Sequence, residues 1–132
     1  MLRILSILTI SVFLSVRPAG AQTFNIAFYN AENLYDTIPS LFYDDSDYTP
    51  EGRRAWNTER YHNKLSNLTR VIEDLSPDVL GLAEVENEQV LRDLITALGG
   101  GYNYIHHTGG DRRGMDLALI YRGDLFVPDR SS

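Results

Sequence analysis

Two short polar clusters contain the residues best suited to chemistry: residues 29–33 (YNAEN) and residues 82–87 (LAEVEN). Each cluster follows an apolar run that predicts a buried strand, over residues 24–29 and 79–83. A carboxylate and a carboxamide at the end of a buried strand offer rigid oxygen ligands. Hard cations such as Mg²⁺ use one or two carboxylates together with water and substrate phosphate. The two clusters together therefore favour a site for a divalent cation.

The alternative is that Asn33 and Asn87 are only turn or helix-capping residues after the strands. A second acidic group, Asp44, Asp45 and Asp47, lies in the long connection over residues 36–55. We interpret it as a solvated loop rather than as a Ca²⁺ site. Connections of this length in small domains are usually functional or mobile.

Composition limits the classes of function. The 132 residues include no cysteine, which excludes disulfides and thiolate metal sites, and the formal net charge is −6. An acidic chain does not coat nucleic acid or anionic membranes through bulk charge. A phosphorylated substrate would therefore have to be attracted locally, by a bound cation and a few arginines.

Residues 1–21 have the pattern of a cleaved export signal. Arg3 supplies the positive start, residues 4–16 are almost all apolar, and Ala19-Gly20-Ala21 is a small-residue cleavage pattern. The apolar run is shorter than the roughly 20 residues that span a bilayer. We expect cleavage after Ala21, a periplasmic or secreted protein, and no stable membrane insertion after cleavage.

The remainder, residues 22–132, predicts one α/β unit. Apolar residues at spacings of three and four predict a helix that begins at Asn57 or Thr58 and ends before Pro77. A second helix is expected after Asn87, ending at the glycines 99–101. Further strands are expected over residues 102–106 and 115–121, and the first strand is apolar enough on both faces to suggest a central position.

Three segments in this order resemble the endonuclease/exonuclease/phosphatase superfamily: residues 28–36, 77–87 and 111–122. The resemblance covers essentially the whole chain after the expected signal. The sequence is similar to the exported bacterial branch of the superfamily. It implies the first half of a four-layer α/β sandwich, incomplete in this chain. It also implies hydrolysis of phosphoester bonds by metal-assisted attack of water, with Mg²⁺ as cofactor and Mn²⁺ or Ca²⁺ as alternatives.

The resemblance assigns roles to particular residues. Asn30 and Glu84 occupy positions of catalytic and metal-site residues, and Glu32 lies where many members have an aspartate near the cation. Glu32 is two residues from Asn30, so in an extended chain it would point to the same face. Arg112 and Arg113 lie in a glycine-containing turn where a guanidinium can bind phosphate, and a solvated basic turn is the alternative.

Other polar residues receive structural interpretations. Asp116 lies within an apolar strand and needs a partner, for which Arg113 and Arg122 are the candidates. His106 and His107 are expected to pack or to face water at a strand end rather than to bind metal or act as an acid or base.

The second-half motifs that the superfamily uses, including its catalytic histidine, have no counterpart after Arg122. Two interpretations follow. In the first, the chain is the N-terminal part of a secreted Mg²⁺-dependent phosphodiesterase or nuclease, inactive alone. In the second, it is a non-catalytic short protein that binds a metal or a protein partner. Nucleic acid, nucleotide and phospholipid headgroup all remain open as phosphoester substrates, and so does the oligomeric state.

Overall fold

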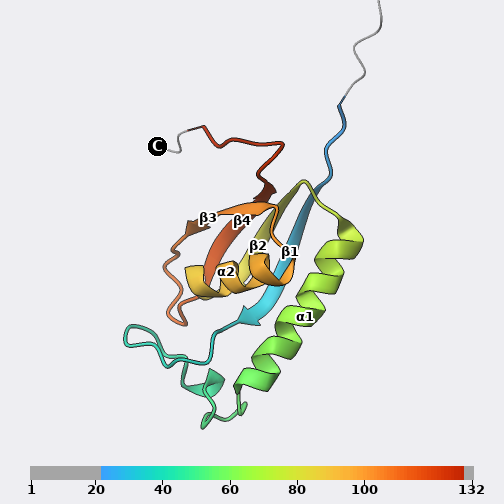
Figure 1. The fold of residues 1–132 in the computed structure, drawn as a ribbon. Coiled ribbons are helices and arrows are strands. Elements are labelled where there is room, and N and C mark those ends of the chain that lie inside the picture. Colours follow the sequence, from blue (N-terminus) through green and yellow to red (C-terminus); the bar gives the residue numbers. More distant parts are fainter. Residues whose placement is uncertain (1–21, 130–132) are drawn as a thin grey trace, which may run out of the picture.

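A computed structural model describes residues 22–129, so the expected signal segment 1–21 lies outside the described residues. Within them, four strands form one mixed sheet in the order β1-β2-β4-β3 (Figure 1). The strands are β1 (Ile26–Leu34), β2 (Val79–Val85), β3 (Tyr102–His107) and β4 (Asp116–Arg122). β1 runs parallel to β2, whereas β4 is antiparallel to both β2 and β3.

The two helices form where capping and periodicity predict them. In α1 (Thr58–Leu75), the Asn57 side chain accepts a hydrogen bond from the backbone N–H of Arg60. In α2 (Glu88–Ala97), the Asn87 side chain accepts from two backbone N–H groups of the first turn. Neither helix in residues 22–129 is both long and apolar enough to span a bilayer.

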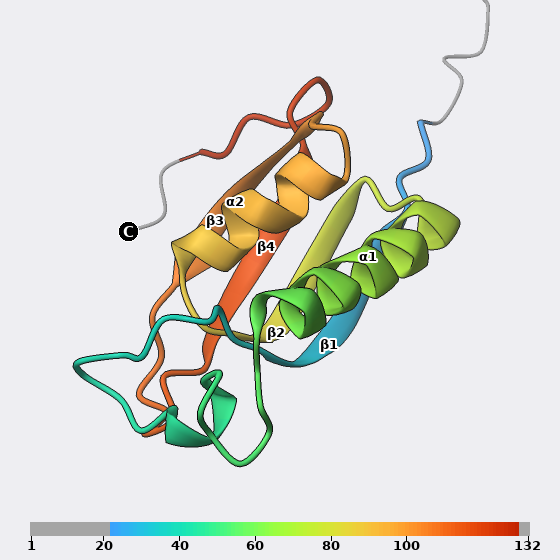
Figure 2. The same ribbon diagram turned by 60° about the horizontal axis from the view of Figure 1, so that its bottom comes forward.

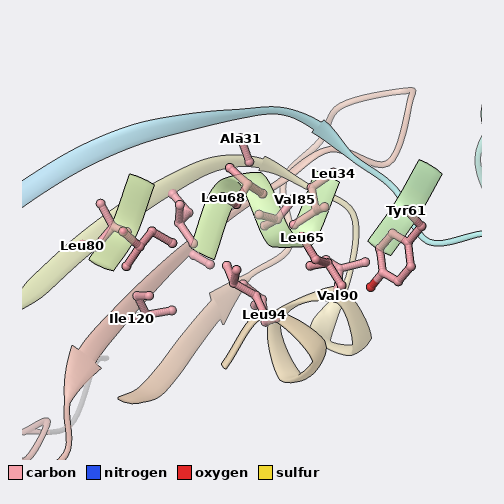
Figure 3. Close-up of a cluster of buried hydrophobic side chains, with 14 residues drawn as sticks. Ala31, Leu34, Tyr61, Leu65, Leu68, Leu80, Val85, Val90, Leu94 and Ile120 are labelled. Carbon is pink, nitrogen blue, oxygen red and sulfur yellow. The ribbon is translucent and has the colours of Figure 1, made fainter. Parts of the chain in front are cut away.

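Both helices cover the same face of the sheet, and the core lies between these two layers (Figure 2). α1 and α2 each direct an apolar stripe onto this face, as expected for helices that pack on a sheet. Figure 3 shows the resulting cluster of side chains. Its fully buried aliphatic members are Ala31, Leu34, Ile72, Leu80, Leu82, Val85, Val90, Leu91, Leu94 and Ile120.

The opposite face of the sheet is apolar and open. Phe28 is 70% exposed and Leu117 is 51% exposed, although both lie within strands. The segment after β4 reaches only part of this face, where Phe126 contacts the Phe24 ring at a centroid distance of 5.0 Å. The chain therefore provides one sheet with helices on one side, which is less than the complete four-layer sandwich that the resemblance implies.

One expectation about the sheet is wrong. β1 lies at an edge of the sheet in the described part of the chain, not at its centre. Its two apolar faces have another cause: one packs against the helices, and the other belongs to the open face.

Candidate functional site

The parallel strands β1 and β2 bring the two polar clusters to one end of the sheet. Asn30 pairs with Ala83, the residue before Glu84, and the register then shifts so that Leu34 pairs with Val85. The register of β2 with β4 shifts at the same place, on either side of Glu84. Both strands therefore contain an irregularity at the level of the predicted site.

Three non-glycine residues at these irregularities have left-handed backbone conformations. Glu32, Asn33 and Glu84 have φ values of 54°, 64° and 59°. Such conformations cost about 1–3 kcal/mol each and occur preferentially at functional sites. Because Glu84 is the extra residue of β2, its side chain is not constrained to the alternation of the strand.

Asn30 stabilises the irregularity of β1 from within. Its Oδ1 accepts a hydrogen bond of 2.7 Å from the backbone N–H of Glu32. This bond occupies Oδ1 and leaves the Nδ2 donors to other partners. The exposed Asn30 thus presents N–H donors at the strand end, next in register to the residue that precedes Glu84.

The two strand ends are joined just beyond the site. The buried Glu86 Oε2 accepts a 2.8 Å hydrogen bond from the backbone N–H of Asp36, and Asn87 Nδ2 donates to Asp36 Oδ2 at 3.0 Å. Burial is the main cause that raises the pKa of Glu86 to about 7; the hydrogen bond from the Asp36 backbone opposes this rise, and the charges of Asp36, Asp45 and Asp116 add to it. This carboxyl group connects the strands, and its neutral form is favoured by its surroundings.

Arg113, a predicted phosphate-binding residue, lies at this end of the sheet, near Asn33. Its guanidinium donates to both carboxylate oxygens of Asp111, with the shorter bond 2.8 Å long, and Nη1 lies 3.4 Å from Asn33 Oδ1. The hydrogen bond to Asp111 raises the pKa of Arg113, and the Glu84 carboxylate contributes further. The Tyr35 hydroxyl donates to the Arg113 carbonyl at 2.9 Å, which anchors the turn.

The other two predicted site residues lie differently. Arg112 is exposed, and no hydrogen bond or ion pair to it occurs in the described part of the chain. Glu32 does not share a face with Asn30 through strand alternation, because its positive φ breaks the extended conformation on which that argument depended. It borders instead a hollow next to α1, together with Lys64.

The partner predicted for Asp116 is wrong. Neither Arg113 nor Arg122 contacts it; Arg122 pairs with Asp124 instead. Asp116 Oδ2 lies 2.8 Å from the buried Nε2 of His106, whose side chain is 12% exposed, although this contact lacks the alignment of a hydrogen bond. Its Oδ1 accepts from the backbone N–H of Gly109 at 2.8 Å. The sequence separation of His106 and Asp116 gave no sign of this pair.

Few side chains of the described residues are grouped in a way that could hold a metal. No cluster of three or more histidine, aspartate or glutamate side chains positioned for a metal occurs in residues 22–129. Glu84 follows Ala83, the register partner of Asn30, and Mg²⁺ commonly uses only one or two carboxylates with water and substrate oxygens. Mg²⁺ at this end of the sheet stays a prediction.

Lys64 was missed by sequence reasoning, and Asn33 has a contact that the sequence did not predict. Asn33 is not only a turn residue, since it contacts Arg113. Lys64 Nζ donates to the Glu32 carbonyl at 3.3 Å and thereby connects α1 to the end of β1. The only local sign in the sequence that Lys64 could belong to a site was its position near Arg60 on the same face of α1.

Solved structures resemble this fold. A mannosyl-6-phosphatase, Bt3783, of Bacteroides thetaiotaomicron matches with a TM-score of 0.50 and 23% identity, over 77% of this chain and 32% of that chain. An endonuclease/exonuclease/phosphatase family protein of the same organism matches with a TM-score of 0.47 and 22% identity, over 75% of this chain and 31% of that one. This chain thus spans about a third of the length of either structure. No curated protein matches significantly.

A family model gives the wider match. It covers residues 25–132, from just before β1 through β4 and beyond, and so includes both polar clusters and the turn with Arg113. The Bt3783 structure shows a likeness in fold, with a TM-score of 0.50. By this match, the chain belongs to the endonuclease/exonuclease/phosphatase family.

Proposed function

We propose that this chain forms the cation- and phosphate-binding part of an Mg²⁺-dependent phosphoester hydrolase, with a phosphodiester as the first substrate to test. The observation that carries the proposal is the pair of irregularities at the ends of β1 and β2. They hold Glu84 and Asn30 on adjacent strands at the cost of three left-handed residues. Such strain is retained where a site requires it.

Each residue has a distinct role in this proposal. Glu84 would hold the cation, which when bound stabilises the negative charge that develops on the phosphoryl oxygens during attack by water. Asn30 can donate from Nδ2 to a phosphoryl oxygen, because its Oδ1 is already occupied by the N–H of Glu32. Arg113, oriented by Asp111 and Asn33, can neutralise a second phosphoryl oxygen.

The first experiment measures cation binding by the 132-residue chain. Mn²⁺, used as a paramagnetic probe for Mg²⁺, should bind the wild-type chain, and Glu84→Gln should weaken binding at least about tenfold, about 1.4 kcal/mol. Glu73→Gln, an exposed acidic position on α1, should leave the affinity unchanged and so controls for the loss of one charge. Equal Mn²⁺ affinity in wild type and Glu84→Gln would remove Glu84 from the site.

The second interpretation, a non-catalytic protein that binds a metal or a partner, is favoured by the sparse acid and histidine set of the described residues. Both interpretations expect the 132-residue chain to bind Mn²⁺ without hydrolysing bis(p-nitrophenyl) phosphate, so hydrolysis that EDTA abolishes would contradict both. The coding DNA beyond Ser132 separates them. Second-half motifs of the superfamily in any reading frame would support the first interpretation, and a stop codon followed by unrelated sequence would support the second.

A further inference from the structure

A basic hollow borders the candidate site on the side of α1. Its volume is about 560 Å³, and it is enclosed by the end of β1, the connection before α1, and the first turns of α1. Figure 2 shows these segments together at one end of the molecule. The residues that line the hollow are Glu32, Asn33, Tyr48, Arg53, Arg54, Ala55, Trp56, Arg60 and Lys64.

The charge of the hollow is unusual for this chain. Four of the twelve lysines and arginines line it in a protein of net charge −6, and Lys64 is the only lysine in the sequence. Arg53 is paired with Asp47 at 2.6 Å. Arg54, Arg60 and Lys64 make no ion pair with an acid among residues 22–129; Arg54 stacks over the Tyr48 ring instead. The hollow therefore retains uncompensated positive charge.

This arrangement opposes the local preferences of a helix. Arg60 lies in the first turn of α1, where the helix dipole disfavours cations. Lys64 follows it by four residues, and like charges at this spacing repel. An anion in the hollow would relieve both penalties, and the N-terminal end of α1 would add to its attraction.

The position of the hollow indicates what the anion belongs to. Glu32 and Asn33 line it from β1, and Asn33 also contacts Arg113 of the candidate site. Lys64 Nζ is held at the Glu32 carbonyl, two residues from Asn30. A substrate bound at Asn30 and Glu84 can therefore extend across the Glu32–Asn33 backbone into the hollow.

We propose that the hollow is a phosphate-binding subsite for a second phosphate group of the substrate, distinct from the phosphate that is hydrolysed. The assignment of this phosphate to the substrate rests on the proposed function, whereas the anion-binding property of the hollow does not. A substrate class with at least two phosphate groups follows. Arg54, Arg60 and Lys64 would bind the second group through charge-assisted hydrogen bonds.

The hollow contains its own reporter. Trp56 is the only tryptophan of the chain, it lines the hollow, and its Nε1 is fixed by a 3.1 Å hydrogen bond to the Tyr35 carbonyl. Titration of the 132-residue chain with inorganic phosphate, at constant ionic strength and with EDTA present, should change Trp56 fluorescence in a saturable way. No saturable change, together with no rise in Tm with phosphate, would overturn the proposal.

Variants locate the binding. Lys64→Gln and Arg60→Gln should each weaken phosphate binding about tenfold, the loss expected for one charge-assisted contact. Arg70→Gln removes the same charge from an exposed position further along α1, outside the hollow, and should not change the affinity. Circular dichroism verifies folding of each variant. An equal loss of phosphate affinity in Arg70→Gln would show that binding depends only on the overall charge of the chain. Unchanged phosphate affinity in both Lys64→Gln and Arg60→Gln would contradict the assignment of the subsite to the hollow.

A bidentate probe tests the link to the candidate site. With Mg²⁺ present, 1,6-hexanediol bisphosphate should bind at least about tenfold more tightly than hexyl phosphate, and Lys64→Gln should abolish this advantage. No advantage in the wild type would overturn the substrate assignment, even if inorganic phosphate binds the hollow. Glu84→Gln should abolish the advantage but retain binding of inorganic phosphate in EDTA. If Glu84→Gln retained both the tighter binding of the bisphosphate and the binding of inorganic phosphate, the proposed function of Glu84 would be contradicted. Phosphate binding in the hollow would still be supported.

Discussion

At the scale of single residues, the end of the β1–β2 pair combines strain, burial and charge within a few positions. Glu84 is displaced from strand alternation, and Asn30 uses one amide atom to stabilise the neighbouring irregularity. Two residues after Glu84, the buried Glu86 connects β2 to the chain beyond β1. A buried carboxyl group with other acids nearby favours its protonated form, so folding is coupled to pH here.

The pH dependence of stability has a definite sign. Glu86 has a pKa of about 7 in the folded chain against 4.5 when exposed, so the folded state binds more protons between these values. Stability should therefore be highest near the lower value and fall as pH rises to about 7, by up to about 3 kcal/mol. Thermal melts in EDTA at pH 5 and pH 7 measure this fall. In Glu86→Gln the fall should be smaller, and an unchanged pH profile in that variant would contradict the assignment.

At the scale of elements, asparagines determine where the chain turns into helices. Asn57 and Asn87 cap α1 and α2, and each accepts backbone N–H groups that the helix itself cannot satisfy. Asn87 also donates to Asp36, so the cap of α2 is connected to the segment after β1. The capping interpretation of Asn87 is thus confirmed. It coexists with a second contact that holds the strand ends together.

Loss of the α2 cap should be measurable. Asn87→Ala removes the bonds to the N–H groups of Gln89 and Val90 and the contact with Asp36, which should cost about 1–2 kcal/mol. Urea unfolding followed by circular dichroism gives the value. Asn67→Ala, at an exposed position within α1, is the matched control and should change stability by no more than about 0.5 kcal/mol. A loss in Asn87→Ala no greater than in the control would show that the cap is dispensable.

At the scale of the whole molecule, the sheet has one packed and one open face. Leu80 on β2 is 0% exposed beneath the helices, whereas Phe28 on β1 is 70% exposed on the other side. Exposed apolar area of this kind on a strand surface promotes association, since soluble monomers rarely retain large contiguous apolar patches. The Bt3783 structure has a similar fold, and this chain matches 32% of its length.

Substitution of a large apolar side chain by alanine should change stability differently on the two faces of the sheet. Leu80→Ala should cost about 2–5 kcal/mol, because it opens a cavity in the packed core. Phe28→Ala should cost far less and should reduce both binding of the hydrophobic dye ANS and self-association, measured by light scattering. The ring of Phe28 does lie over Gly81, so a small loss of stability is expected. A large loss in Phe28→Ala would show that the open face is packed in solution.

The sequence by itself determined the elements and the family. Helix boundaries at Asn57 and Asn87 were predictable because capping and periodicity depend on residues within one or two turns. The polar clusters at the ends of two apolar runs identified Asn30 and Glu84 as candidate site residues for the same reason: the relevant residues are neighbours in the chain.

Only the tertiary structure decided which distant residues meet. The edge position of β1, the contact of His106 with Asp116 and the basic hollow at Lys64 all depend on how strands and helices are placed in space. The left-handed Glu32 and Glu84 also escaped prediction, since their own sequence favours no such conformation and the pairing of adjacent strands imposes it. Local preferences act over a few residues, whereas these features arise from contacts between segments far apart in the chain.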